Sequence, residues 1–367
     1  MKIICVAGTR PEAIKMAPVI LELKKNPDFD VRVLATAQHR QMLDQVFAVF
    51  GIVPDIDLDI MQPNQALTTL TARLLLKLDD VLKTEAPDVV LAQGDTTTVM
   101  TVAMACFYLR IPFGHIEAGL RTWDMDNPFP EEMNRVIAGK LSRWHFAPTQ
   151  SSHDNLVREG VPTEQIWITG NTVVDALQSV SAELQDVGVE LDASKRLILV
   201  TAHRRENFGE PYREICRAVK HIADHNSDVQ ILYPVHPNPS IQSVAYELLG
   251  NHPQIVLCPP LDYIPFVGAM QRAYIILSDS GGVQEEAPAL AKPVLVLRRE
   301  TERPEAVDAG VVKLVGPEFN AIVNECQILL DDEAAYKSVA RGISPYGDGH
   351  ASERIHEVLR NYLSSLK

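Results

Sequence analysis

The sequence predicts an α/β protein built from two Rossmann-like, doubly wound domains that face each other. Short β-branched runs alternate with helical periods, which is typical of βαβ units and a parallel sheet. This rhythm restarts near residue 196 without obvious sequence repetition. At 367 residues the chain also exceeds the size at which a single hydrophobic core usually stops growing. Two domains are therefore expected.

The expected elements follow one another along both halves of the chain. The first helix is predicted over residues 12–25. The strands are predicted over residues 3–6, 31–35, 88–92, 112–116 and 143–147, then 196–200, 229–233, 255–257, 274–277 and 294–296. We place the N-terminal domain at residues 1–170 and the C-terminal domain at 171–350, with a crossing over 169–175. A last helix, expected over 352–363 within the segment 351–367, can pack back on the N-terminal domain.

Composition argues against two kinds of partner. The formal net charge of −14 disfavours nucleic acid, because binding phosphates needs a basic face. No run of 18 or more residues is apolar without polar interruption, so no membrane partner is expected. The first residues follow a strand pattern rather than that of a signal peptide. We therefore expect a cytoplasmic protein.

No metal or other cofactor is expected. The five cysteines are scattered among apolar neighbours and lack metal-ligand spacing. Two acidic alternations, residues 55–59 and 124–126, have the look of metal-binding patterns. The first fits a short edge strand with an acidic outer face, since no partner ligands lie nearby in sequence. We interpret neither as a metal site.

Polar residues gather where the predicted strands of the first half end. Ligands of parallel α/β sheets bind outside these carboxyl ends, so the ends sample the candidate site. Arg10 and Lys15 follow the first strand near a helix N-terminus, which suits an anion. Asp95 and Glu117 follow two successive strands. Asp95 alone is better explained as a helix N-cap, but the pair indicates a site.

Two more carboxylates, Glu131 and Glu132, follow the proline-bracketed residues 128–130, in a loop that can fold over the same mouth. Clustered carboxylates shift one another's pKa values apart, so that one site can hold both an acid and a base. The first half of the chain therefore predicts proton-transfer chemistry.

The second half carries a positive cluster and a glycine turn at its strand ends. Residues 203–205 read His-Arg-Arg after the strand over 196–200, and His236 follows the next strand. The Ser-Gly-Gly of residues 280–282 lies between a strand and a helix, where free N–H groups can bind a diphosphate. Glu286, farther along that helix, can accept hydrogen bonds from both ribose hydroxyls. Arg303 follows the next strand and suits a phosphate oxygen.

Together these motifs make the chain resemble the non-hydrolysing UDP-N-acetylglucosamine 2-epimerases along essentially its whole length. The motifs that carry the resemblance are Gly8-Thr9-Arg10-Pro11-Glu12, Gly94-Asp95-Thr96-Thr97-Thr98, Glu117-Ala118-Gly119-Leu120-Arg121, Pro128-Phe129-Pro130-Glu131-Glu132, Gly170-Asn171-Thr172, His203-Arg204-Arg205-Glu206-Asn207, Asp279-Ser280-Gly281-Gly282 and Thr301-Glu302-Arg303-Pro304-Glu305. The resemblance implies a glycosyltransferase B-type architecture with a cleft between the domains. It also implies a homodimer, with UDP-N-acetylglucosamine and UDP as ligands.

The resemblance implies a role for each candidate residue. The residues implied to act in catalysis are Asp95, Glu117, Glu131 and His203. Those implied to bind the substrate are Arg10, Lys15, Phe266, Ser280, Gly281, Gly282, Glu286 and Arg303. Leu261 stands where some members carry a glutamine beside the uracil.

Some Gram-positive members bind a second substrate molecule as an allosteric activator, and the resemblance extends to part of that site. The residues concerned are Gln38, His39, Gln41, Arg205 and His236. The chain departs from such members at Asn64-Gln65, where they carry arginine and glutamine.

The implied activity is that of an isomerase: reversible C2 epimerisation of UDP-N-acetylglucosamine to UDP-N-acetylmannosamine, for cell-surface polysaccharide. UDP is eliminated to give 2-acetamidoglucal and then re-added. This route needs a base and an acid on opposite faces of C2, and cations for the departing diphosphate. Which carboxylate serves which face stays open. The alternatives are a hydrolysing epimerase that releases N-acetylmannosamine, an epimerase of a C6-modified UDP-sugar, a retaining glycosyltransferase and a sugar-nucleotide sensor without turnover.

Overall fold

The computed structural model describes residues 1–36, 40–60, 65–182, 184–301 and 303–366, and the chain divides into two α/β units. The first unit comprises Met1–Ala176 and Tyr346–Lys367, and the second comprises Leu177–Pro345. The chain therefore leaves the first unit and later returns to it. The chain thus passes between the units after residues 176 and 345, where the sequence analysis placed the domain boundaries at residues 170 and 350.

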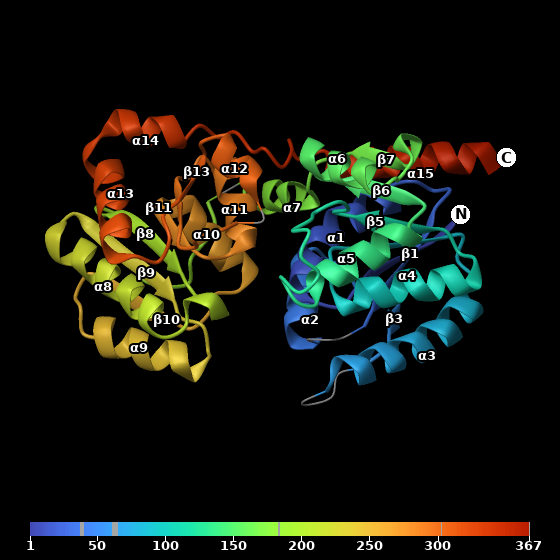
Figure 1. Ribbon diagram of the computed structural model, residues 1–367, viewed down its shortest axis with the longest axis horizontal. Coiled ribbons are helices and arrows are strands. Elements are labelled where there is room, and N and C mark those ends of the chain that lie inside the picture. Colours follow the sequence, from blue (N-terminus) through green and yellow to red (C-terminus); the bar gives the residue numbers. More distant parts are fainter. Residues whose placement is uncertain (37–39, 61–64, 183, 302, 367) are drawn as a thin grey trace. The chain divides into compact units, whose positions relative to one another are not determined.

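The first unit is built on a seven-stranded parallel sheet of order β3-β2-β1-β4-β5-β6-β7 (Figure 1). Its strands are β1 (Lys2–Ala7), β2 (Asp30–Ala35), β3 (Ile56–Asp57), β4 (Val89–Gln93), β5 (Phe113–Ile116), β6 (Trp144–Ala147) and β7 (Ile166–Ile168). Its helices are α1 (Arg10–Lys24), α2 (Arg40–Val49), α3 (Leu67–Glu85), α4 (Thr97–Leu109), α5 (Glu131–Leu141), α6 (Gln150–Arg158), α7 (Thr172–Val180), through which the chain leaves, and α15 (Ala351–Leu366).

The second unit repeats this plan with a six-stranded parallel sheet of order β10-β9-β8-β11-β12-β13. Its strands are β8 (Arg196–Thr201), β9 (Val229–Pro234), β10 (Ile255–Cys258), β11 (Ala273–Ser278), β12 (Val294–Val296) and β13 (Val312–Leu314). Its helices are α8 (Glu210–His225), α9 (Pro239–Leu249), α10 (Tyr263–Arg272), α11 (Gly281–Glu286), α12 (Pro304–Asp308), α13 (Phe319–Asp331) and α14 (Glu333–Val339), with 3₁₀ turns at Arg205–Asn207 and Ala287–Leu290.

The predicted fold class is confirmed by these two sheets, and each predicted strand is present with small changes at its ends. The acidic alternation at residues 55–59 contains β3, which pairs with β2 at one edge of the first sheet, as expected. Two strands were missed, β7 and β13. Each is three residues long, lies at a sheet edge and has only one fully buried position, so neither forms a long apolar run.

The central strands of both sheets are apolar over most of their length because helices cover both faces. Residues 3–7 of β1 and 275–277 of β11 are at most 1% exposed. Buried strands of this kind bring polar groups to the sheet only where they end. The fold therefore concentrates polar side chains at the carboxyl edge of each sheet.

The C-terminal helix α15 packs against α1 of the first unit. The His356 ring contacts Phe29 edge-on with centroids 5.5 Å apart, and its Nε2 lies 3.1 Å from Asn26 Nδ2. Asp175, on helix α7, accepts hydrogen bonds from Ser352 N (2.8 Å) and Ser352 Oγ (2.7 Å). The segments in which the chain leaves and re-enters the first unit are thus tied together. None of the helices in the described part of the chain is long and apolar enough to span a bilayer.

Candidate active site

Glu117 lies directly after β5, at the carboxyl edge of the first sheet. Its Oε2 accepts hydrogen bonds from Lys15 Nζ (2.5 Å), Gln93 Nε2 (2.8 Å) and Asn171 Nδ2 (3.2 Å). The backbone of Glu117 is left-handed (φ +64°), a conformation that costs energy for a residue with a Cβ. Three donors and a strained backbone therefore hold this carboxylate in one place, with Lys15 as its counter-charge.

Asp95 follows β4, the neighbour of β5 in the sheet. One of its carboxylate oxygens accepts a hydrogen bond from Arg135 Nη2 (2.7 Å), and its backbone carbonyl accepts one from Asn134 Nδ2 (2.9 Å). The N-cap of α4 is Thr96, whose hydroxyl accepts a hydrogen bond from Val99 N. The reading of Asp95 as a plain N-cap is therefore wrong, and its half-buried carboxylate is available for another task.

Glu131 and Glu132 are the first two residues of helix α5, so the expectation that they lie in the loop is wrong. Glu132 is 1% exposed, and its carboxylate accepts hydrogen bonds from the backbone N–H groups of Thr122 and Trp123. Arg135 Nη1 lies 3.4 Å from the same carboxylate. Glu132 thus secures the segment before α5, whereas Glu131 is half-buried at the first position of the helix.

A further carboxylate of this edge, Glu12, was missed as a site residue. It is 3% exposed, and its Oε2 accepts hydrogen bonds from Gly8 N (2.5 Å) and Thr9 N (3.1 Å). Its Oε1 accepts one from Thr96 Oγ1 (2.5 Å), in the turn that carries Asp95. Burial raises the pKa of Glu12 to about 7 against the effect of these donors. The Thr-x-x-Glu capping box was the sequence signal that marked it.

In the second unit, His203 lies in the loop after β8. Asp279, directly after β11, is fully buried and accepts hydrogen bonds from the backbone N–H groups of His203 (2.9 Å) and Arg204 (2.9 Å). The His203 ring stacks on that of His236, with centroids 5.3 Å apart and planes 8° apart. Burial lowers the pKa of His203 below its usual value, while the Asp279 carboxylate opposes that shift.

The side chain of Arg303 packs against the glycine turn after β11, residues 280–282. Ser280 is the N-cap of α11, and a Cβ on Gly281 would lie 2.6 Å from Arg303 Nη1 and 2.7 Å from its Cζ. Arg303 Nε donates to Glu285 Oε1 at 2.6 Å, and both side chains are largely buried. The guanidinium is thus held flat against the turn, and glycine at position 281 makes room for it. Glu286 ends the same helix and is 7% exposed.

The other predicted residues fall at the following places. Arg10 is the first residue of α1, and Phe266 is half-buried on α10. Of the expected allosteric residues, Arg205 and His236 are exposed on the second unit. Gln38 and His39 and the side chain of Gln41 lie outside the described residues, as does Glu302 of the Arg303 motif.

In both acidic segments, residues 55–59 and 124–126, aspartate carboxylates accept hydrogen bonds from backbone N–H groups. Asp55 Oδ2 accepts a hydrogen bond from Val33 N, Asp57 Oδ1 accepts one from Asp59 N, and Asp124 Oδ1 accepts one from Asp126 N. In the part of the chain that the structure describes, no group of three or more His, Cys, Asp or Glu side chains is arranged to hold a metal ion.

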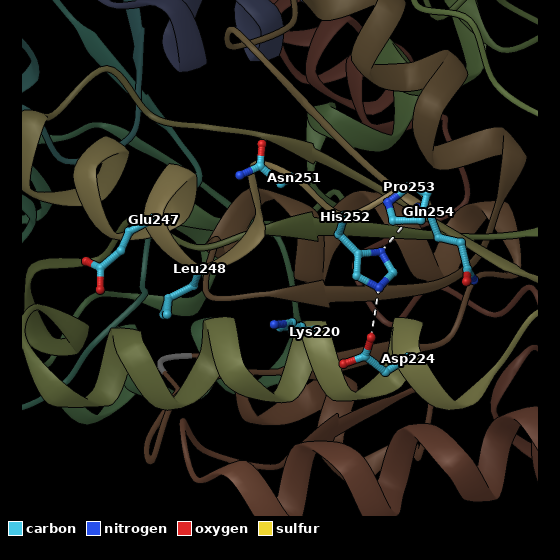
Figure 2. Close-up of a pocket in the computed structure, with 8 residues that line it drawn as sticks. All are labelled: Lys220, Asp224, Glu247, Leu248, Asn251, His252, Pro253 and Gln254. Carbon is cyan, nitrogen blue, oxygen red and sulfur yellow. Dashed lines mark hydrogen bonds and ion pairs between the residues drawn. The ribbon is translucent and has the colours of Figure 1, made fainter.

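A hollow of about 560 Å³ on the second unit is separate from these residues, and Figure 2 shows the side chains that line it. It lies between α8, α9 and the turn before β10, at the amino end of that strand. Inside it His252 Nε2 lies 3.0 Å from Asp224 Oδ1. Because strands of a parallel sheet all run the same way, this pocket is at the edge opposite His203 and Asp279.

Comparison with known proteins identifies the family to which the chain belongs. The family model described as UDP-N-acetylglucosamine 2-epimerase matches residues 21–360. The chain belongs to this family. A curated UDP-N-acetylglucosamine 2-epimerase of Salmonella typhimurium is 52% identical over 376 residues, covering 100% of both chains. The Neisseria meningitidis UDP-GlcNAc 2-epimerase, whose crystal structure is bound to UDP-GlcNAc, is 46% identical and has a TM-score of 0.92 over 98% of this chain and 100% of its own.

Membership of the UDP-N-acetylglucosamine 2-epimerase family confirms the resemblance seen in the sequence, and it places the chain among enzymes, the isomerases. The fold likeness reaches farther than the family. The glycotransferase of kitacinnamycin is only 13% identical but has a TM-score of 0.67 over 98% of both chains, which shows a shared fold alone. The predicted fold of two Rossmann-like domains, of the glycosyltransferase B type, is therefore confirmed.

Proposed function

We propose that the protein catalyses reversible C2 epimerisation of UDP-N-acetylglucosamine to UDP-N-acetylmannosamine. A base removes the C2 proton while the C1–O bond to UDP breaks, which gives 2-acetamidoglucal. UDP then adds back at C1, and an acid protonates C2 from the other face. The steps balance without an oxidant or reductant, so the route needs no redox cofactor.

The observation that carries this proposal is the carboxylate set after β4 and β5. Glu117 is held by three donors and a left-handed backbone, and Asp95 lies beside Arg135 after the adjacent strand. A site that only bound a sugar nucleotide would not need these two carboxylates together. In the proposal Asp95, Glu117 and Glu131 move protons, because proton transfer at C2 requires groups of this kind on both faces.

The cationic and amide groups are proposed to hold the leaving UDP. Arg10, Lys15 and His203 supply positive charge or hydrogen bonds to the diphosphate. The residues proposed to bind the rest of UDP are Phe266, Ser280, Gly281, Gly282, Glu286 and Arg303. We further propose a cytoplasmic homodimer that supplies N-acetylmannosamine units for cell-surface polysaccharide. A second UDP-N-acetylglucosamine contacting Arg205 and His236 is proposed as an activator.

The test is to incubate the protein with UDP-N-acetylglucosamine in D₂O and to follow C1 and C2 by NMR. We expect UDP-N-acetylmannosamine with deuterium at C2, and deuterium entering the substrate pool as well. Free N-acetylmannosamine with UDP would instead indicate a hydrolysing epimerase. Unchanged substrate would disprove the proposal, and the same assay with C6-modified UDP-sugars would then show whether one of them is the substrate.

A further inference from the structure

Asp279 is a fully buried carboxylate to which none of the proposed chemical steps has been assigned. It is the first residue after β11, directly before the Ser280-Gly281-Gly282 turn. Its backbone N–H donates to the carbonyl of Thr201, at the end of the adjacent strand β8. A buried carboxylate destabilises a fold unless donors surround it. Its partners therefore indicate what it is retained for.

Within the described part of the chain, the donors to the Asp279 carboxylate come from the loop that carries His203. They are His203 N (2.9 and 3.1 Å to the two oxygens), Arg204 N (2.9 Å) and Asn207 Nδ2 (3.0 Å). Asn207 Nδ2 also donates to the carbonyl of Leu297, just past β12. The loop is therefore fastened to the strands beside it, and Asp279 is the point to which three of its groups converge.

The side chain of His203 faces the same carboxylate. Its Nδ1 lies 3.7 Å from Asp279 Oδ1, and the ring is 38% exposed, so its other edge remains accessible. The other titratable or charged groups that act on the ring are His236, stacked on it after β9, and Arg204 in the same loop. Burial is the main effect that disfavours a positive charge on His203; His236 and Arg204 add to it, and Asp279 is the group that favours the charge.

We propose that Asp279 is a positioning residue for the reaction: it fixes the orientation of the His203 ring and supports its positive charge toward the departing diphosphate. This inference rests on the proposed function, in which His203 serves the leaving UDP. Asp279 touches no reacting atom in this account. It acts through His203, in the way that a buried carboxylate orients and charges an imidazole in other enzymes.

The first test needs neither a variant nor a substrate. Nitrogen chemical shifts of His203 in the uncomplexed protein report which ring nitrogen carries the proton when the ring is neutral. We expect the proton on Nδ1, the nitrogen that faces Asp279. A neutral ring protonated on Nε2 would overturn the proposal whatever the enzyme's activity proves to be.

The second test compares Asp279→Asn with a matched variant, Asp224→Asn, which alters the His252–Asp224 pair at the opposite edge of the same sheet. Asp279→Asn removes the charge that favours protonation, so the pKa of His203 should fall and the alkaline limb of kcat/KM should move to lower pH. We expect kcat to drop at least about tenfold near neutrality, with KM little changed. Asp224→Asn should leave the His203 titration and the pH profile as they are.

A double-mutant cycle separates positioning from folding. If Asp279 acts through His203, Asp279→Asn should cost far less in a His203→Gln background than in the native protein. An equal loss in both backgrounds, or a uniform loss with an unshifted pH profile, would overturn the proposal. The two proposals can also fail separately. If Asp279→Asn shifts the pKa of His203 but the native protein has no epimerase activity, the proposed function is wrong and the positioning role of Asp279 is right.

Discussion

In both units a buried carboxylate joins the turns that follow two adjacent central strands. The carboxylate follows the first strand of the pair in one unit and the second strand in the other. In each sheet the unit's first strand lies beside its central partner, β1 beside β4 and β8 beside β11. In the first unit Glu12, after β1, reaches across to Thr96 after β4. In the second unit Asp279, after β11, reaches back to the loop after β8. Each carboxylate ties together the two turns at the centre of the carboxyl edge.

The links differ in what they hold. Glu12 accepts hydrogen bonds from two backbone N–H groups of its own turn and from one hydroxyl of the neighbouring turn, so it interacts only with these two turns. Asp279 accepts the donors of the opposite loop and faces an imidazole. The first link therefore shapes a turn beside acidic groups, while the second supports a group that can carry positive charge. In the proposed function, the same fold plan serves proton transfer at the edge of the first unit and the leaving UDP at the edge of the second.

The largest effect on turnover is expected at Asp95, one of the carboxylates proposed to transfer a proton. Asp95→Asn removes a proposed acid or base but leaves the second unit untouched, so turnover should fall by about 10²–10⁴-fold. Binding of UDP, measured by calorimetry, should change little. Deuterium exchange at C2 measures the chemical loss. Lost UDP binding would mean that Asp95 is structural and that the two edges are not separate in function.

A smaller effect is expected at the turn that holds Arg303. A Cβ at position 281 would press on the guanidinium from 2.6 Å, so Gly281→Ala should displace Arg303 and weaken UDP binding by about 10–100-fold, the value of a charge-assisted hydrogen bond. Gly282→Ala is the matched control. Its Cβ would meet no protein atom nearer than Glu286 Oε2 at 3.8 Å, so Arg303 should stay in place whatever the added methyl group does to UDP. Crystal structures of the two variants show whether Arg303 moves, and an unmoved Arg303 in Gly281→Ala would contradict the packing explanation.

The fold was predictable because buried parallel strands appear as short apolar runs, and those runs locate the edges that carry Asp95 and Glu117. The contacts that organise those edges were not predictable. Asn171 reaches Glu117 from 54 residues away, and the donors to Asp279 lie 72 to 76 residues from it. Spacing along the chain gives no sign of such contacts. Glu12 was different, since its capping box is local, but the box alone does not reveal the third bond to Thr96.

The smallest change in activity, and the clearest change in stability, is expected at Glu12. Its pKa is raised by burial from 4.5 to about 7, so between these values the folded protein keeps a proton that the unfolded chain has lost. The stabilisation is full below pH 4.5 and is lost as pH rises to about 7, with a slope of about 1.4 kcal/mol per pH unit at most.

Glu12→Gln should flatten this dependence, because its amide is neutral at every pH and can still accept from Gly8 N and donate to Thr96 Oγ1. Chemical unfolding at intervals from pH 5 to 8 measures the slope. Glu22→Gln, on the same helix but outside the link, should leave the slope in place. If the native slope survived in Glu12→Gln, the pH response would belong to another group. The comparison between Glu12 and Asp279 would then reduce to the hydrogen bonds that each carboxylate accepts.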